Sequence, residues 1–168
     1  MRRAFRVAAI LAAGMLAGCP NGGKVEVSDR PPRPVDRIDE LVVRVTPPTP
    51  MNWDDVPGSD GLQVQVNCFQ REEPLSVTVR GTLEFLLYEG RATLAQLADR
   101  QPLKTWQFDG LNLTGHAGRS IVGWGYAMRL PWGRPGPRSS SVTLLTRYRP
   151  VEGDVKTSRP LQVAMEPK

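Results

Sequence analysis

Short runs in which apolar and polar residues alternate, each closed by glycine or proline, limit most strongly how this chain folds. The clearest run is GLQVQVNCF at residues 61–69, whose apolar members are Leu62, Val64, Val66 and Cys68. Successive side chains of a strand point to opposite faces, so this spacing predicts a strand with one buried face. A chain built from such runs must pair them into sheets.

The same alternation recurs along the chain. Further strands are expected at residues 38–46, 75–79, 82–89, 103–108, 120–132, 141–150 and 160–167. Gly81 is expected to bend one long run into two strands. One short helix is expected at residues 93–98, crossing between sheets, because Thr93 and Gln96 have the spacing of a capping box.

About eight short strands and one helix in residues 36–168 predict an all-β fold. Their number and spacing loosely resemble those of Ig-like modules, which implies a β-sandwich with Greek-key connections. A closed barrel is the alternative. About 130 residues bury a serviceable core without help from disulfides.

A different signal occupies the N-terminus. Arg2, Arg3 and Arg6 precede an apolar run at residues 7–16, and small residues follow it. This is the order of a secretory signal peptide, here residues 1–18. The run is too short for a membrane-spanning helix, which needs about 20 apolar residues. The sequence therefore predicts export.

The signal ends in Leu16-Ala17-Gly18-Cys19, which resembles the lipobox of bacterial lipoproteins at all four positions. The resemblance implies that diacylglycerol is attached to the sulfur of Cys19, that cleavage occurs before this residue, and that the new amino terminus is usually acylated. Lipid on Cys19 implies a membrane-anchored protein of the cell envelope. Which membrane retains it stays open, as does the choice between general secretory and twin-arginine export.

Residues 19–35 are polar, then rich in proline, which predicts a lipidated flexible tether before the domain.

Composition narrows the classes of partner. After residue 18 the chain has 19 basic and 17 acidic residues, a net charge of +2. The arginines are scattered, so no nucleic-acid partner is expected. With Cys19 acylated, Cys68 has no partner for an intramolecular disulfide.

No catalytic arrangement is expected, and no cofactor. His116 is the single histidine and lies in the glycine-flanked stretch LTGHAGR. The sequence contains no nucleophile elbow, paired-histidine metal motif or phosphate loop. Cys68 alternates with core valines, so we expect a buried, unreactive thiol.

The loop NWDDVPGSDG carries a weak calcium candidate formed by Asp54, Asp55 and Asp60. Carboxylates are suitable Ca²⁺ ligands, but three of them leave the coordination shell incomplete. Aspartate is also favoured in turns for its local hydrogen bonds, and that reading is preferred. The prediction is therefore no metal site.

Aromatic residues supply the candidate ligand contact. Trp132 lies with Arg134 and Arg138 in PWGRPGPR, which predicts either an exposed contact or a cation–π brace. Trp124 and Tyr126 fall on the apolar side of their run and are expected in the core.

Together these features predict a membrane-anchored lipoprotein that presents a non-catalytic β-sandwich for contact with an envelope protein or polysaccharide. The alternative is a carbohydrate- or peptidoglycan-binding module that uses loop aromatics such as Trp132. A small envelope hydrolase ranks last. The identity of the partner and the oligomeric state stay open.

Overall fold

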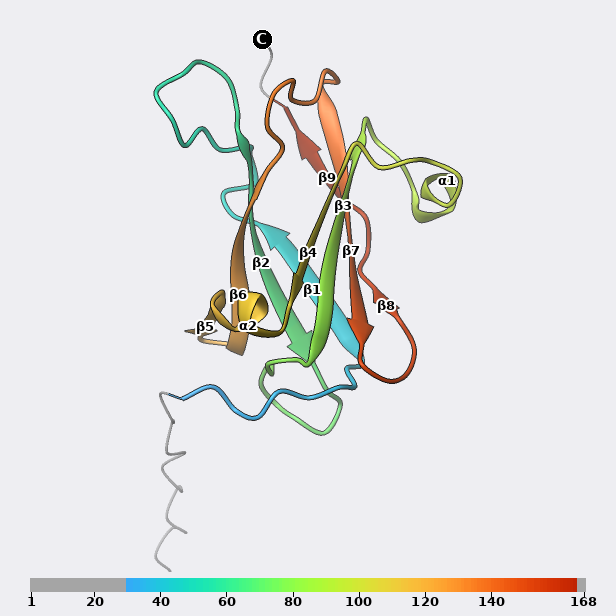
Figure 1. Cartoon of the computed structure of the whole chain (residues 1–168). Helices are drawn as coiled ribbons and strands as arrows, with labels where there is room; N and C mark the ends of the chain where they lie inside the picture. The colour runs from blue at the N-terminus through green and yellow to red at the C-terminus, as the bar shows by residue number, and fades with distance from the viewer. Residues whose placement is uncertain (1–29, 166–168) are drawn as a thin grey trace, which may run out of the picture.

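The computed structural model describes residues 30–165, which form a sandwich of two antiparallel β-sheets (Figure 1). The predicted lipid site at Cys19 lies outside the described residues and stays a prediction. The strands are β1 (Glu40–Val45), β2 (Gly61–Phe69), β3 (Gly81–Glu89), β4 (Lys104–Asp109), β5 (Ala117–Ser120), β6 (Gly123–Pro131), β7 (Ser141–Pro150), β8 (Lys156–Thr157) and β9 (Leu161–Ala164). One sheet has the order β1-β2-β6-β5, and the other has the order β4-β3-β7-β8, with β9 also paired to β7.

The strand order is that of the immunoglobulin sandwich, in which strands A, B, E and D form one sheet and C, F and G the other. Here β1, β2, β6 and β5 take the places of A, B, E and D, while β3, β7 and the β8/β9 edge take those of C, F and G. The chain changes sheets after β2, β4 and β6. The predicted all-β sandwich is confirmed, and the closed barrel is wrong.

The core lies between the sheets and follows the predicted alternation. On β2, the buried side chains of Leu62, Val64 and Val66 face those of β3, where Leu83 and Phe85 are equally buried. Gln63 and Gln65, which alternate with these residues on β2, are only partly buried. Period-two patterning thus places the apolar face of each sheet inward.

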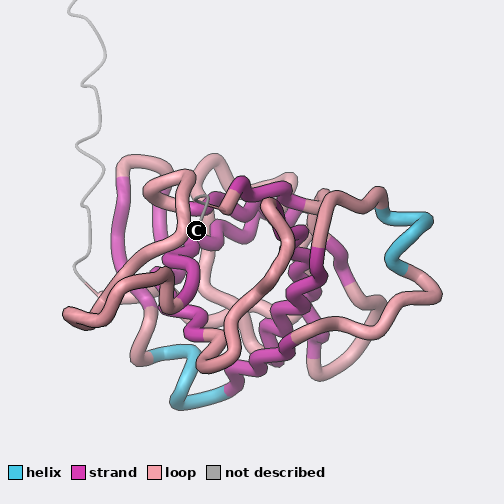
Figure 2. The backbone as a smooth tube through the Cα atoms, turned by 90° about the horizontal axis from the view of Figure 1, so that it is seen from above, coloured by secondary structure: helices cyan, strands magenta, loops and turns pink. Residues whose placement is uncertain are grey.

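Two short helices, α1 (Leu94–Leu97) and α2 (Gly110–Thr114), lie at the periphery of the sandwich (Figure 2). The predicted capping box is present: the backbone N–H of Thr93 donates to the side chain of Gln96 at 2.9 Å. Within residues 30–165, neither helix nor any other segment forms a helix able to cross a bilayer.

The predicted crossing of α1 between sheets is wrong, because α1 joins β3 to β4, which are neighbours in one sheet. The outer face of β3 is apolar at Leu86 and Tyr88. Leu97 of α1 covers these residues in a second cluster with Ala92 and Leu145. The helix therefore shields an apolar patch that water would otherwise contact.

The strand expected at residues 75–79 does not form. Ser76 bridges to Gly123 of one sheet, whereas Val79 bridges to Val35 on the other side of the segment. A segment that passes from one sheet to the other cannot keep one continuous ladder. The bend expected at Gly81 is confirmed, since its φ of 127° lies in the region that favours glycine.

One edge of the second sheet is interrupted. β8 and β9 pair with successive parts of β7, and Ser158, Arg159 and Pro160 lie between them. Across the interruption, the backbone N–H of Ser158 donates to the Thr146 carbonyl at 2.8 Å. The Ser158 hydroxyl accepts the N–H of Thr146 at 3.1 Å. A side chain thus stands in for a backbone acceptor.

The last residues of the predicted tether lie against the sandwich. The hydroxyl of Thr78 donates to the carbonyl of Pro32 at 2.9 Å. Val35 donates its N–H to the Thr78 carbonyl at 2.9 Å and accepts the N–H of Arg80 at 2.7 Å. Contact with the domain thus begins before residue 36, the predicted boundary, and the segment crosses the lower end of the sandwich in Figure 1.

Candidate functional site

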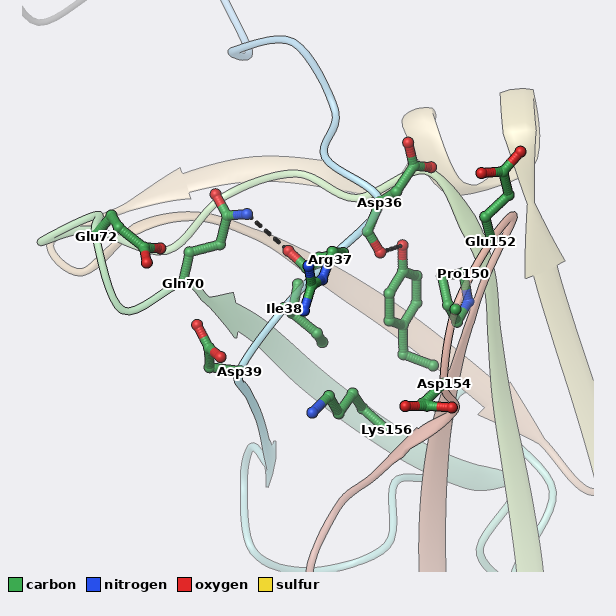
Figure 3. Close-up of a pocket in the computed structure, with 12 residues that line it drawn as sticks. Asp36, Arg37, Ile38, Asp39, Gln70, Glu72, Pro150, Glu152, Asp154 and Lys156 are labelled. Carbon is green, nitrogen blue, oxygen red and sulfur yellow. Dashed lines mark hydrogen bonds between the residues drawn. The ribbon is translucent and has the colours of Figure 1, made fainter.

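A polar hollow of about 590 Å³ opens at the end of the sandwich where the N-terminal segment joins it (Figure 3). Three distant parts of the chain form its wall: residues 36–39, residues 70 and 72 of the β2–β3 loop, and residues 148–156 from the end of β7 to the start of β8. Because the wall comes from separate loops, no single stretch of sequence indicates it.

Carboxylates dominate the wall of the hollow. Its charged members are Asp36, Asp39, Glu72, Glu152 and Asp154 on the acidic side, and Arg37 and Lys156 on the basic side. Five acidic groups against two basic groups leave the wall a net charge of −3, and Asp36 is also paired with Arg80, outside the wall, at 3.6 Å. Figure 3 shows these side chains distributed around the opening rather than gathered at one point.

Tyr148 of β7 fixes one side of the hollow. Its ring is buried, and its hydroxyl lies among the backbone carbonyl oxygens of Val35 at 3.3 Å, Asp36 at 2.8 Å, and Arg80. Burial, together with the Asp36 carboxylate, raises the pKa of Tyr148. The hydroxyl therefore stays protonated and holds the N-terminal segment against β7.

Further hydrogen bonds join the N-terminal segment to the β2–β3 loop. The side-chain amide of Gln70 donates to the carbonyl of Arg37 at 2.7 Å. The carboxylate of Asp39 accepts the backbone N–H of Arg71 at 2.7 Å. These bonds order two walls of the hollow before any ligand arrives, which lowers the entropic cost of binding.

The hollow favours a cationic group. Its surplus of carboxylates raises the local concentration of positively charged ligands. Within residues 30–165, no set of three histidine, cysteine or acidic residues is grouped closely enough to hold a metal ion.

The predicted exposed contact at Trp132 is wrong. Trp132 is only 6 % exposed and belongs to the core cluster, and its indole N–H donates to the carbonyl of Ser59 at 2.8 Å. Arg134 and Arg138 are exposed on the loop that follows. The cation–π contact in the structure instead places Arg129 over Trp53, 5.6 Å from the ring centroid.

Two of the three aspartates of the β1–β2 loop act as turn residues. The carboxylate of Asp60 accepts the backbone N–H of Trp53 at 2.6 Å and that of Asp54 at 3.2 Å. Asp54 in turn accepts the N–H of Val56 at 2.8 Å, and Asp55 is exposed. This is the turn chemistry preferred from the sequence.

His116 and Cys68 both pack against other residues of the sandwich. The ring of His116 is half-buried, 5.1 Å from the ring of Phe108 and edge-on to it, with Nδ1 3.2 Å from the Ala127 carbonyl oxygen. Cys68 is fully buried and free, and burial raises the pKa of its thiol to about 12. The expected buried thiol is confirmed.

The two aromatic residues expected in the core differ. Tyr126 is buried, and its hydroxyl accepts the backbone N–H of Val79 at 2.7 Å, so the expectation is confirmed. Trp124 is only half-buried and lies outside the core cluster, so the expectation is wrong there. Trp124 pairs with Arg119 of the short edge strand β5, near the end of the sandwich.

Comparison with known proteins adds no relative: no family model, no curated protein and no solved structure matches this chain.

Proposed function

We propose that this protein is an exported lipoprotein, anchored to a membrane through lipid on Cys19, whose sandwich is a non-catalytic binding module. The observation that carries the proposal is the order of basic, apolar and small residues that ends in Leu16-Ala17-Gly18-Cys19. Immunoglobulin-type sandwiches serve many unrelated functions, so the fold itself does not decide between them.

Charge favours an envelope protein as the partner over a polysaccharide. The hollow carries a net charge of −3, which attracts lysine or arginine side chains. The carbohydrate alternative relied on an exposed aromatic platform at Trp132, and this residue is buried. We therefore place the contact at the hollow, with a basic segment of the partner as its ligand.

The anchor is tested by Cys19→Ser in the native host. Wild-type protein is expected in the membrane fraction, with an intact mass that starts at residue 19 and includes fatty acids. Cys19→Ser is expected to lose that lipid mass. Cys68→Ala is the matched control, because it removes the other cysteine and leaves the lipobox intact. Wild-type protein that begins at Met1 without fatty acid would refute the anchor.

The contact is tested by photo-crosslinking in the intact envelope. A photoreactive residue at position 152, in the wall of the hollow, is expected to give a crosslinked protein. The same residue at position 55, an exposed site in the loop at the opposite end, is expected to give none. Asp154→Lys should weaken the crosslink from position 152. Equal crosslinking from both ends would remove the hollow as the contact.

A further inference from the structure

The most exposed large apolar side chains gather at one end of the sandwich. Among residues 30–165, Ile121 is 100 % exposed, Leu111 is 90 % exposed and Val151 is 66 % exposed. Leu75 and Val155, at the same end, are about half exposed. Single exposed apolar residues are ordinary on a protein surface, but several at one end of a domain make that end a candidate interaction surface.

Four separate segments carry these side chains: the β2–β3 loop, α2, the β5–β6 turn and the β7–β8 turn. All four lie at the lower end of the sandwich in Figure 1, where the described chain begins at Arg30. We call these five residues the apolar tips. No sheet pairing requires them to be apolar, because each lies in a turn or a helix outside the strands.

The opposite end differs. Its exposed large apolar residues are Val56, Leu94 and Leu103, and the most exposed of them, Leu94, reaches 52 %. They lie on the β1–β2 loop and around α1, at the upper end in Figure 1. The two ends of one domain therefore offer matched sites for comparison.

We propose that the apolar tips rest in the headgroup region of the membrane that holds the lipid on Cys19, so that this end of the sandwich faces the bilayer. The inference rests on the proposed lipid anchor. Ten residues separate Cys19 from Arg30. A step of about 3.6 Å per residue allows at most about 40 Å between them. The proposed anchor thus keeps Arg30, where the chain enters this end of the sandwich, within about 40 Å of the lipid.

Proximity makes a weak apolar contact effective. Each apolar tip adds little by itself, but an anchored domain meets the membrane at a high effective concentration. Because the acidic hollow lies at the same end, the basic segment of the partner would reach it along the membrane surface, and anionic lipids are not the expected attraction. Burial of apolar side chains is the expected one, and it depends little on salt.

The test places a fluorescent reporter at single introduced cysteines. Cys68 is buried with a raised thiol pKa, and lipid occupies Cys19, so an environment-sensitive dye reacts with the introduced site. The sites are Ile121→Cys and Val151→Cys, with Leu94→Cys as the control. The full lipidated protein is placed in phosphatidylcholine vesicles that contain lipids spin-labelled near the headgroup.

Dye at positions 121 and 151 is expected to shift to shorter wavelengths and to be quenched, whereas dye at position 94 is not. A paired substitution, Leu111→Ser with Ile121→Ser, is expected to lower the docked-to-undocked ratio about tenfold, read from dye at position 151. Leu94→Ser is the matched control and should leave this reading unchanged. The replaced side chains are nearly free of protein contact, so the fold should persist.

Co-sedimentation with the vesicles separates the two proposals. If the protein sediments and all three dyes behave alike, the anchor stands and docking of the apolar tips is wrong. If the protein does not sediment, the lipid anchor is wrong and docking loses its basis.

Discussion

At the scale of single residues, Trp132 shows what local sequence rules miss. The alternation of Tyr126, Met128 and Leu130 continues to Trp132, which places this side chain inward. The glycines and prolines that follow Trp132 made the stretch look like a loop, so the alternation was the better guide. Its indole N–H then finds a carbonyl acceptor in a loop 73 residues away, which no local pattern reveals.

We expect Trp132→Ala to lower the free energy of unfolding by about 3–5 kcal/mol, as removal of a large core side chain does. Trp132→Phe should cost less, since it keeps much of the packing and loses the bond to Ser59. Denaturant titration measures both. Leu111→Ala is the control for an exposed position, expected within about 0.5 kcal/mol of wild type. A similarly small effect at Trp132 would contradict its place in the core.

Cys68 and Tyr126 should make the fold sensitive to alkali. Burial raises the pKa of Cys68 from 9.0 to about 12 and that of Tyr126 from 10.0 to about 12. Above pH 9 the unfolded chain releases a thiol proton that the native state retains, so the free energy of unfolding falls as pH rises toward 12. The slope is at most about 1.4 kcal/mol per pH unit for each group.

Urea titrations from pH 8 to pH 11 measure this slope. Cys68→Ala should flatten the fall between pH 9 and pH 10 and leave the later fall caused by Tyr126 and Tyr148, whose pKa values burial also raises. The same slope in wild type and variant over that first interval would show that Cys68 is not shielded in the native state.

At the scale of elements, the sequence predicts the bounds of long, fully paired strands best. β2 and β7 have the predicted bounds, and each is paired along both edges. β5, β8 and α2 were not predicted, because two to five residues are too few to show a period. Residues 75–79 alternate like a strand, but they form only isolated bridges, to β2 and β6 of one sheet and to Val35 of the N-terminal segment.

The bend at Gly81, the first residue of β3, can be tested by substitution, with Gly58 as the control. Gly81 has φ 127°, and a Cβ there would collide with the carbonyl oxygen of Arg149. Gly58 has φ 123°, with nothing near the same position. Gly58→Ala should cost about 1 kcal/mol for backbone strain alone. Gly81→Ala should cost more, by thermal or denaturant unfolding. Equal losses would show that the Arg149 contact relaxes freely.

At the scale of the whole molecule, the sequence predicts the fold but not the candidate site. The sequence predicted the sandwich because alternation is local. The hollow and the apolar tips depend on which loops meet at one end, and that follows from the order of strands in the sheets. The N-terminal segment joins the sandwich at the same end, through bonds such as that from Thr78 to Pro32.

Two buried threonines test this attachment. Thr78 donates its hydroxyl to Pro32, whereas no partner for the Thr146 hydroxyl appears among the residues that the structure describes. Thr78→Val should lower the free energy of unfolding by about 1 kcal/mol.

Thr146→Val should leave the free energy of unfolding unchanged or raise it, because a methyl group replaces an unsatisfied hydroxyl. Thr78→Val should also quicken hydrogen exchange at the Val35 amide, and Thr146→Val should not. If the two variants respond alike, the bond to Pro32 does not hold the segment.

The break between β8 and β9 bears on how copies of the protein behave side by side. Pro160 has no backbone N–H to donate. The strands on either side of the break are short: β8 has two residues and β9 has four. A neighbouring chain that approached this edge would find no uninterrupted row of donors and acceptors to extend. If lipid on Cys19 confines copies to one membrane, as proposed, they meet often, and this edge gives them no continuous strand to extend.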